Sequence, residues 1–153
     1  MVLNHPAGRD VLIKYVDEVL GFEDYVNRYL LAASYIPEGN GDLLYPRMHM
    51  FGHAMELSLK AFIASTDNEW KEIHDLVSLL NTAMAYGLLA TEHEQKSVVP
   101  NLNKIYYKPD NSDWRFPSRY PRAVTGIWIT PTNKQLIESI RSFLDQALQK
   151  AKR

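Results

Sequence analysis

Apolar residues recur at helical spacing along most of the chain, and short polar or Pro/Gly-rich breaks separate the periodic stretches. The pattern predicts five helices. The first is expected over residues 11–35, and the second begins between residues 43 and 47 and ends at 63. The third and fourth are expected over 69–86 and 92–107, and the last begins at 130–132 and ends at 150. Short connections favour antiparallel neighbours, so we expect one all-α, up-and-down bundle over residues 1–153, with residues 1–8 as a loose tail.

The stretch Arg47–Ile63, RMHMFGHAMELSLKAFI, is apolar around most of its circumference and is therefore expected to be the central helix. One polar stripe interrupts it. The stripe residues are His49, His53, Glu56 and Lys60, spaced four, three and four positions apart, so they lie on one helix face. An unpaired buried charge is costly. The neighbouring helices are therefore expected to leave a polar groove along the stripe.

Local signals indicate where the helices begin and end. Thr91 followed by Glu94 is a capping-box pattern at the start of the fourth helix. Gly87 occupies a position where a left-handed residue commonly follows a helix. Asp67 or Asn68 is a suitable N-cap for the third helix, which would then begin near residue 69.

Two residues weaken the helical pattern locally. Gly21 is a weak helix former, and the first helix is expected to be continuous, bent or split at that point. Pro100 lies within the fourth predicted helix, where proline removes a backbone hydrogen bond. The pattern therefore leaves the middle of that helix undetermined.

Residues 108–131 differ in composition from the rest of the chain. The segment KPDNSDWRFPSRYPRAVTGIWITP contains four prolines, two tryptophans and three arginines. It is too rich in aromatic residues to be disordered and is expected to form a long ordered loop before the last helix. Residues 124–129 could form a short strand.

Arginines and aromatic residues alternate in this loop, notably at Arg115, Arg119, Tyr120 and Arg122. Such a combination can hold phosphates and stack bases, so these four residues are candidates for binding nucleic acid or another ligand. The alternative is a lid packed over the bundle, with its arginines in water or paired with acidic residues.

Composition narrows the range of functions. The chain is 46% hydrophobic and 23% charged, as is usual for a soluble globular protein. Because its net charge is only −1, any contact with nucleic acid would need a local patch of basic residues. The absence of cysteine excludes disulfides, a thiol nucleophile and a cysteine zinc site. The start, MVLNHPAGRD, does not look like a signal peptide, and no apolar run is long enough to span a membrane. We therefore expect a cytoplasmic protein without membrane contact.

The spacing of His49, His53 and Glu56 would also let two imidazoles and a carboxylate share a metal ion, with His74 or His93 completing the site. The alternative is that Glu56 pairs with Lys60 one turn later and that the histidines line the groove. The second interpretation is preferred, because no fourth ligand is evident. Neither a metal nor another cofactor is expected.

Several segments resemble the HEPN family of small helical-bundle domains. The resemblance lies in Ala54, Glu56, Leu57, Lys60 and Ala61 of HAMELSLKAFI, in Tyr29-Leu30-Leu31-Ala32-Ala33, in His74-Asp75-Leu76 with Leu79-Leu80, and in Arg119-Tyr120-Pro121. Together these segments span about residues 22–148. The resemblance implies a bundle of four or five helices, usually a homodimer, that is connected with nucleotides or RNA. Many members are metal-independent RNases or toxins paired with an antitoxin, and others are non-catalytic binding modules.

The RNase signature of that family is an arginine, four to six residues, then a histidine, a spacing that Arg47 and His53 match. His53 could serve as acid or base and Arg47 could hold a phosphate. On a regular helix, however, the two residues point about 120° apart. They would converge on one substrate only if Arg47 precedes the first turn or if a dimer brings copies together. Otherwise Arg47 is a solvated helix-start residue and His53 a structural histidine.

The sequence thus predicts a HEPN-like domain that binds or cleaves RNA or nucleotides as a homodimer. The candidate catalytic residues are Arg47 and His53, and the groove residues are His49, Glu56 and Lys60. The rival prediction is a non-catalytic module of the same fold. Its aromatic loop and dimer face would bind a partner protein, such as an antitoxin, or a small molecule.

Overall fold

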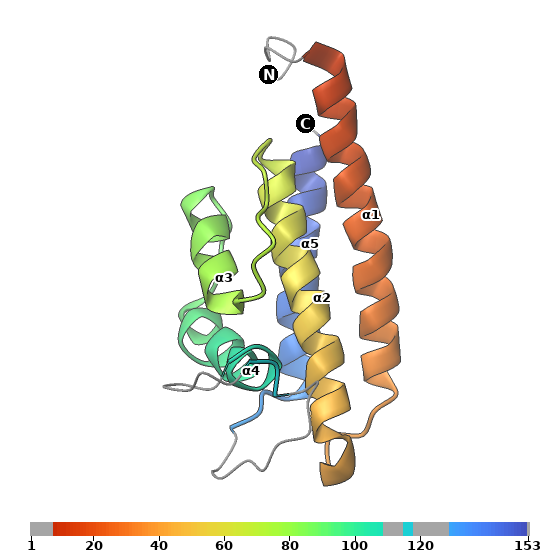
Figure 1. Cartoon of the computed structure of the whole chain (residues 1–153), viewed down its shortest axis with the longest axis vertical. Helices are drawn as coiled ribbons and strands as arrows, with labels where there is room; N and C mark the ends of the chain where they lie inside the picture. The colour runs from red at the N-terminus through yellow and green to blue at the C-terminus, as the bar shows by residue number, and fades with distance from the viewer. Residues whose placement is uncertain (1–7, 109–114, 118–128, 153) are drawn as a thin grey trace.

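The computed structural model describes residues 8–108, 115–117 and 129–152 (Figure 1). Within these residues the chain forms five α helices: α1 (Gly8–Ser34), α2 (Leu44–Ser65), α3 (Leu76–Ala85), α4 (Val99–Tyr106) and α5 (Asn133–Ala151). A short 3-10 helix, η2 (Gly41–Leu43), precedes α2, and a π-helical turn, η3 (Glu94–Val98), leads into α4. The described residues contain no strand, so the prediction of an all-α fold is confirmed.

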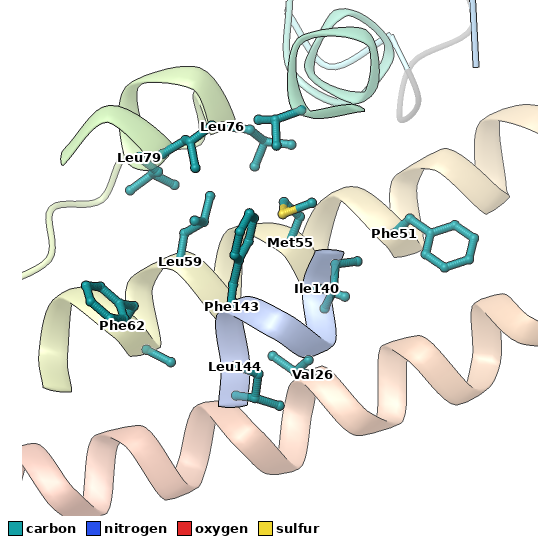
Figure 2. Close-up of a cluster of buried hydrophobic side chains, with 14 of the residues drawn as sticks. Val26, Phe51, Met55, Leu59, Phe62, Leu76, Leu79, Ile140, Phe143 and Leu144 are labelled. Atoms are coloured by element: carbon teal, nitrogen blue, oxygen red, sulfur yellow. The ribbon is translucent and has the colours of Figure 1, made fainter. Parts of the chain in front are cut away.

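The central helix is α2, as its apolar circumference predicts. It contacts α1, α3, α4 and α5, and α1 and α5 also contact each other. In Figure 1, α1, α2 and α5 run side by side along the long axis, while α3 and α4 lie on the other side of α2 from α1. Figure 2 shows side chains of α1, α3 and α5, among them Val26, Leu79 and Phe143, gathered around those of α2. Each such side chain contributes about 1.5–3 kcal/mol when fully buried.

The third helix is shorter than the periodicity predicts, because it begins at Leu76 and not near Glu69. After α2, the chain runs back alongside α2 over residues 66–75 before α3 begins (Figure 1). Trp70 and Ile73 fit the helical period, but they pack against the core from this non-helical segment. Burial alone therefore accounts for their apolar character.

A different N-cap explains the later start of α3. The Asp75 carboxylate accepts two backbone N–H groups of the first turn, so the prediction that Asp67 or Asn68 caps this helix is wrong. Asn103 of α4 reinforces the cap, since its Nδ2 donates to Asp75 Oδ1 at 3.1 Å. The Oδ1 of Asn103 accepts the Leu76 N–H at 2.9 Å. A contact with a distant helix thus decides where α3 starts.

Other local signals agree with the structure. α1 continues through Gly21 without a break. Gly87 has a φ of +106°, as expected for a left-handed residue after a helix. Thr91 and Glu94 form the predicted reciprocal pair, each side chain accepting the backbone N–H of the other. Pro100 lies in the first turn of α4, where a missing N–H is tolerated, and the irregular part of this region is the π-helical turn before it.

The last helix begins with a capping box, in which Thr132 and Gln135 exchange hydrogen bonds. Of the preceding loop, residues 108–131, the described residues are 108, 115–117 and 129–131. The strand suggested for 124–129 lies outside them except for Ile129, which is exposed and not in a strand. None of the described helices combines the length and apolarity needed to cross a membrane.

A close approach between α2 and α4 depends on Gly52. A β-carbon at this position would overlap the Cγ and Cδ1 atoms of the Tyr106 ring. Glycine in a helix interior costs about 1 kcal/mol relative to alanine. Truncating a buried large aromatic side chain costs roughly 3–5 kcal/mol, and Tyr106 is fully buried. The packing of the ring therefore outweighs the helix cost of the glycine.

We expect Gly52→Ala to lower the free energy of unfolding by about 1–3 kcal/mol, because the Tyr106 ring or a whole helix has to shift. Gly21→Ala is the matched control, since nothing lies within 4 Å of its added β-carbon. It should stabilise the protein by about 0.5–1 kcal/mol. Urea unfolding followed by circular dichroism measures both changes. A Gly52→Ala protein as stable as Gly21→Ala would contradict the close approach.

Candidate functional site

The carboxylate of Glu56 is the centre of a polar cluster inside the bundle. Glu56 lies in the middle of α2, and its side chain is only 3% exposed. Oε2 accepts a hydrogen bond from Lys60 Nζ at 3.1 Å. Oε1 accepts two hydrogen bonds, from His74 Nδ1 at 2.8 Å and from Tyr106 Oη at 3.0 Å. The carboxylate thus joins α2, the segment before α3 and the end of α4.

The surroundings of Glu56 stabilise its charged form. Burial by itself raises the pKa of Glu56, because the carboxylate loses its hydration. The positive charge of Lys60 and the hydrogen bonds from His74 and Lys60 outweigh burial and hold the pKa of Glu56 below its ordinary value. The carboxylate is therefore ionised at neutral pH and can only accept hydrogen bonds.

His53 joins the cluster through Tyr106, because His53 Nδ1 lies 3.3 Å from Tyr106 Oη. The tyrosine hydroxyl has a single proton and donates it to Glu56. His53 Nδ1 therefore has to be the donor in the contact with Tyr106. Tyr29 of α1 packs edge-on against the His53 ring at a centroid distance of 4.5 Å, and His49 stacks on it at 6.4 Å.

The polar stripe of α2 does not line an open groove along its whole length. His49 and His53 are partly exposed, but Glu56 and Lys60 are buried. The ring of Trp70 lies 5.0 Å from Lys60 Nζ in a cation–π contact. The predicted groove is thus wrong for the second half of the stripe, because side chains from the 66–75 segment and α4 fill it.

Aromatic and cationic residues lie beside His74. The Phe116 ring packs edge-on against His74 at a centroid distance of 5.3 Å and against Tyr107 at 5.4 Å. The Arg115 guanidinium lies 5.6 Å from the centre of the Tyr107 ring. Among the described residues Arg115 is the only arginine of the loop, and the rings of Tyr107 and Phe116 connect it to His74. Arg119, Tyr120 and Arg122 lie outside the described residues.

Arg47 occupies a different environment. It is the fourth residue of α2, it is only 3% exposed, and its Nη1 donates to Asn133 Oδ1 of α5 at 2.6 Å. Asn133 in turn donates through Nδ2 to the Ile36 carbonyl and through its backbone N–H to Glu38. Burial lowers the pKa of Arg47, while the Glu38 carboxylate opposes that effect.

The positions of Arg47 and His53 follow from regular helix geometry. Both lie within α2, so they point about 120° apart, with Arg47 toward α5 and His53 toward α1 and α4. The condition that Arg47 precedes the first turn is not met. Arg47 is also buried and not a solvated helix-start residue, since it holds α2, α5 and the α1–α2 connection together.

The four histidines that the structure describes do not gather around a potential ion. In the part of the chain that the structure describes, no three His, Asp or Glu side chains meet in a way that could hold a metal. His74 lies next to Glu56, as the metal-site interpretation requires. The two side chains are joined by a direct hydrogen bond, however, which leaves no room for an ion between them. His93 lies against Gln135 of α5, with 3.3 Å between the Nε2 atoms.

Sequence reasoning missed Tyr106 and assigned His74 only a secondary role. Tyr106 is separated from Glu56 by 50 positions, and no local pattern connects them. Gly52 was the available signal, because a glycine inside an otherwise apolar helix indicates a close approach by another element. It does not indicate which residue approaches.

The unfolding free energy is expected to fall as the pH drops below about 4.3, the ordinary pKa of glutamate. The pKa of Glu56 is lowered by folding, so its contribution is fully present above that value and disappears as the pH falls through the folded pKa. Glu56→Gln lacks this contribution and should be less stable than wild type by about 3 kcal/mol at neutral pH. The difference should shrink near pH 3, as measured by urea unfolding. An equal difference at both pH values would contradict the assignment.

Comparison with known proteins adds no family to this description. No protein-family model, curated protein or solved structure matches the chain. The chemistry of the Glu56 cluster is therefore the basis on which a function can be proposed.

Proposed function

We propose that this chain is a HEPN-like domain that binds RNA or nucleotides and cleaves RNA without a metal ion, with the Glu56 cluster as its site. The observation that carries this proposal is an ionised carboxylate kept in the interior together with imidazole and phenol groups. Replacing a buried ion pair by apolar residues is often neutral or stabilising by about 1–4 kcal/mol. A charged cluster in the place of such an apolar core supports a chemical role, since perturbed titratable groups concentrate at functional sites.

The side chains around Glu56 supply the groups that metal-free RNA cleavage needs. Histidine changes its charge near neutral pH and can act as acid or base, and His53 and His74 both belong to the cluster. Arg115 supplies a cation that suits a phosphate, and the rings of Tyr107 and Phe116 are suited to stacking unpaired bases. In this proposal Arg119, Tyr120 and Arg122 also bind the RNA.

The proposal includes a homodimer that forms through α1. Leu20 and Leu31 of α1 are 54% and 60% exposed, and their spacing places them on one side of the helix. Tyr35, one residue beyond the end of α1, is 79% exposed. A hollow of about 300 Å³ adjoins Leu31, and Ile137 of α5 contributes to its lining. Exposed apolar side chains that share a helix face are typical of protein–protein contacts, and a second copy supplies a self-complementary partner.

A second candidate function is RNA or nucleotide binding without cleavage, or binding of an antitoxin-like partner protein. The environment of Arg47 favours it, because this guanidinium hydrogen-bonds to Asn133 and points away from His53. Arg47, the arginine of the RNase signature, would then have a structural role. The first candidate function requires that RNA is cut, and the second requires that it is not.

We expect the purified protein to bind and cut fluorescein-labelled single-stranded RNA in EDTA. DNA of the same sequence should stay intact because it lacks the 2′-hydroxyl. His53→Ala should slow cleavage about 100-fold, the usual lower effect of losing a general acid or base. Fluorescence anisotropy measures binding and denaturing gels measure cleavage. Binding without cleavage would favour the non-catalytic function, and absence of both would contradict the proposal.

The dimer has its own test. Leu31→Glu places a charge on the exposed face of α1 and should convert the dimer into a monomer, as measured by size-exclusion chromatography with light scattering. Leu89→Glu is the matched control, because Leu89 is 77% exposed and lies outside α1. A wild-type monomer, or a Leu31→Glu dimer, would contradict an interface at this face.

A further inference from the structure

His74 combines an exposed ring with a buried hydrogen-bond partner. Its side chain is 41% exposed, whereas that of Glu56 is 3% exposed, and 2.8 Å separate His74 Nδ1 from Glu56 Oε1. The segment 66–75 brings His74 to this position by running back along α2 (Figure 1). A buried carboxylate that orients an accessible imidazole is a recurring arrangement in acid–base catalysis.

The hydrogen bond determines which nitrogen of His74 carries the proton. Glu56 is ionised and already accepts hydrogen bonds from Lys60 and Tyr106, so it can only accept from His74. The proton of a neutral His74 is therefore on Nδ1, and the lone pair is on Nε2. Within the described residues, no hydrogen bond or ion pair involves His74 Nε2.

A chain of hydrogen bonds connects His74 with His53. It runs from His74 to Glu56 at 2.8 Å, from Glu56 to Tyr106 at 3.0 Å and from Tyr106 to His53 at 3.3 Å. Both imidazoles use Nδ1 in this chain. The two imidazoles thus lie at opposite ends of one polar network that is centred on Glu56, and histidine is the side chain used most often as a general acid or base.

We infer that His74, oriented by Glu56, is the general base that removes the 2′-hydroxyl proton from RNA bound at this site, and that His53 is the acid. This inference rests on the proposed RNA cleavage. It assigns the role of the base to a residue that is not part of the RNase signature formed by Arg47 and His53. Glu56 then acts as a positioning residue.

The step conserves atoms and protons. His74 Nε2 takes the 2′-hydroxyl proton while the 2′-oxygen forms a bond to phosphorus and the bond from phosphorus to the 5′-oxygen breaks. The leaving 5′-oxygen takes a proton from the imidazolium of His53. His74 then releases its proton to water and His53 regains one from water. The products carry a 2′,3′-cyclic phosphate on one fragment and a 5′-hydroxyl on the other.

The first experiment compares His74→Ala with wild type, using single-stranded RNA in EDTA. We expect kcat to fall about 100-fold or more, while the Kd for a 2′-O-methyl RNA of the same sequence stays unchanged. Added imidazole should restore part of the activity. His93→Ala is the matched control, because its ring lies against Gln135 and not Glu56, and it should retain full activity.

The outcomes separate this inference from the proposed function. If wild type cuts RNA and His74→Ala cuts it equally fast, the inference is wrong and RNA cleavage stands. If wild type binds RNA without cutting it, both the cleavage and the inference fail. If His74→Ala loses activity together with its folded circular dichroism signal, His74→Gln replaces it, and full activity of a folded His74→Gln would again refute the inference.

The second experiment tests the role of Glu56 by nitrogen-15 NMR of the histidine rings. Neutral His74 should show the pattern of a protonated Nδ1 in wild type, and Glu56→Gln should shift it toward the tautomer with a protonated Nε2. Tyr106→Phe keeps the carboxylate and should leave the His74 tautomer unchanged. A protonated Nε2 in wild type, or no shift in a folded Glu56→Gln protein, would overturn the positioning role.

Discussion

One buried charge constrains much of this bundle. The ionised carboxylate of Glu56 would cost several kcal/mol in the interior without partners. Lys60 can pair with it from the same helix, but the other two partners have to come from elsewhere. His74 reaches it because the chain folds back along α2 instead of starting a helix, and Tyr106 reaches it because α4 approaches α2 closely. Two irregular features of the fold therefore serve the same carboxylate.

A second buried polar group secures the first turn of α2. Arg47 hydrogen-bonds to Asn133, whose own amide groups contact the connection between α1 and α2. The apolar contacts of α2 supply most of the stability but are tolerant of small shifts, whereas hydrogen bonds to charged groups require particular geometry. The polar contacts at the start and in the middle of α2 thus help to determine how the other helices are aligned around it.

The helical periodicity was sufficient to predict the fold class and the central helix, because a helix buried on most sides has to be apolar on most sides. The 4-3-4 spacing was likewise sufficient to place His49 and His53 on one side of α2. The start of α3 was not predictable in this way. Trp70 and Ile73 match a helical period whether or not they are helical, and Asn103 decides the boundary from a distant helix.

The site was predictable only where its members are close in sequence. Glu56 and Lys60 are one turn apart, so their ion pair follows from spacing. The contacts of Glu56 with His74 and Tyr106 depend on the path of the chain between the helices, which periodicity does not encode. Arg47 matched a known spacing, but its partner Asn133 lies 86 positions away, and that partner determines where the guanidinium points.

The fit of the Tyr106 ring against Gly52 also bears on how this chain can diverge. A side chain at position 52 is acceptable only after the ring at 106 has been removed, and removal of the ring first leaves a void and takes a donor from Glu56. If positions 52 and 106 change one substitution at a time, the protein with only the first substitution is therefore less stable than the protein before it. Substitutions at the two positions should therefore be correlated among descendants of this protein, and the substitution that destabilises the protein less should come first.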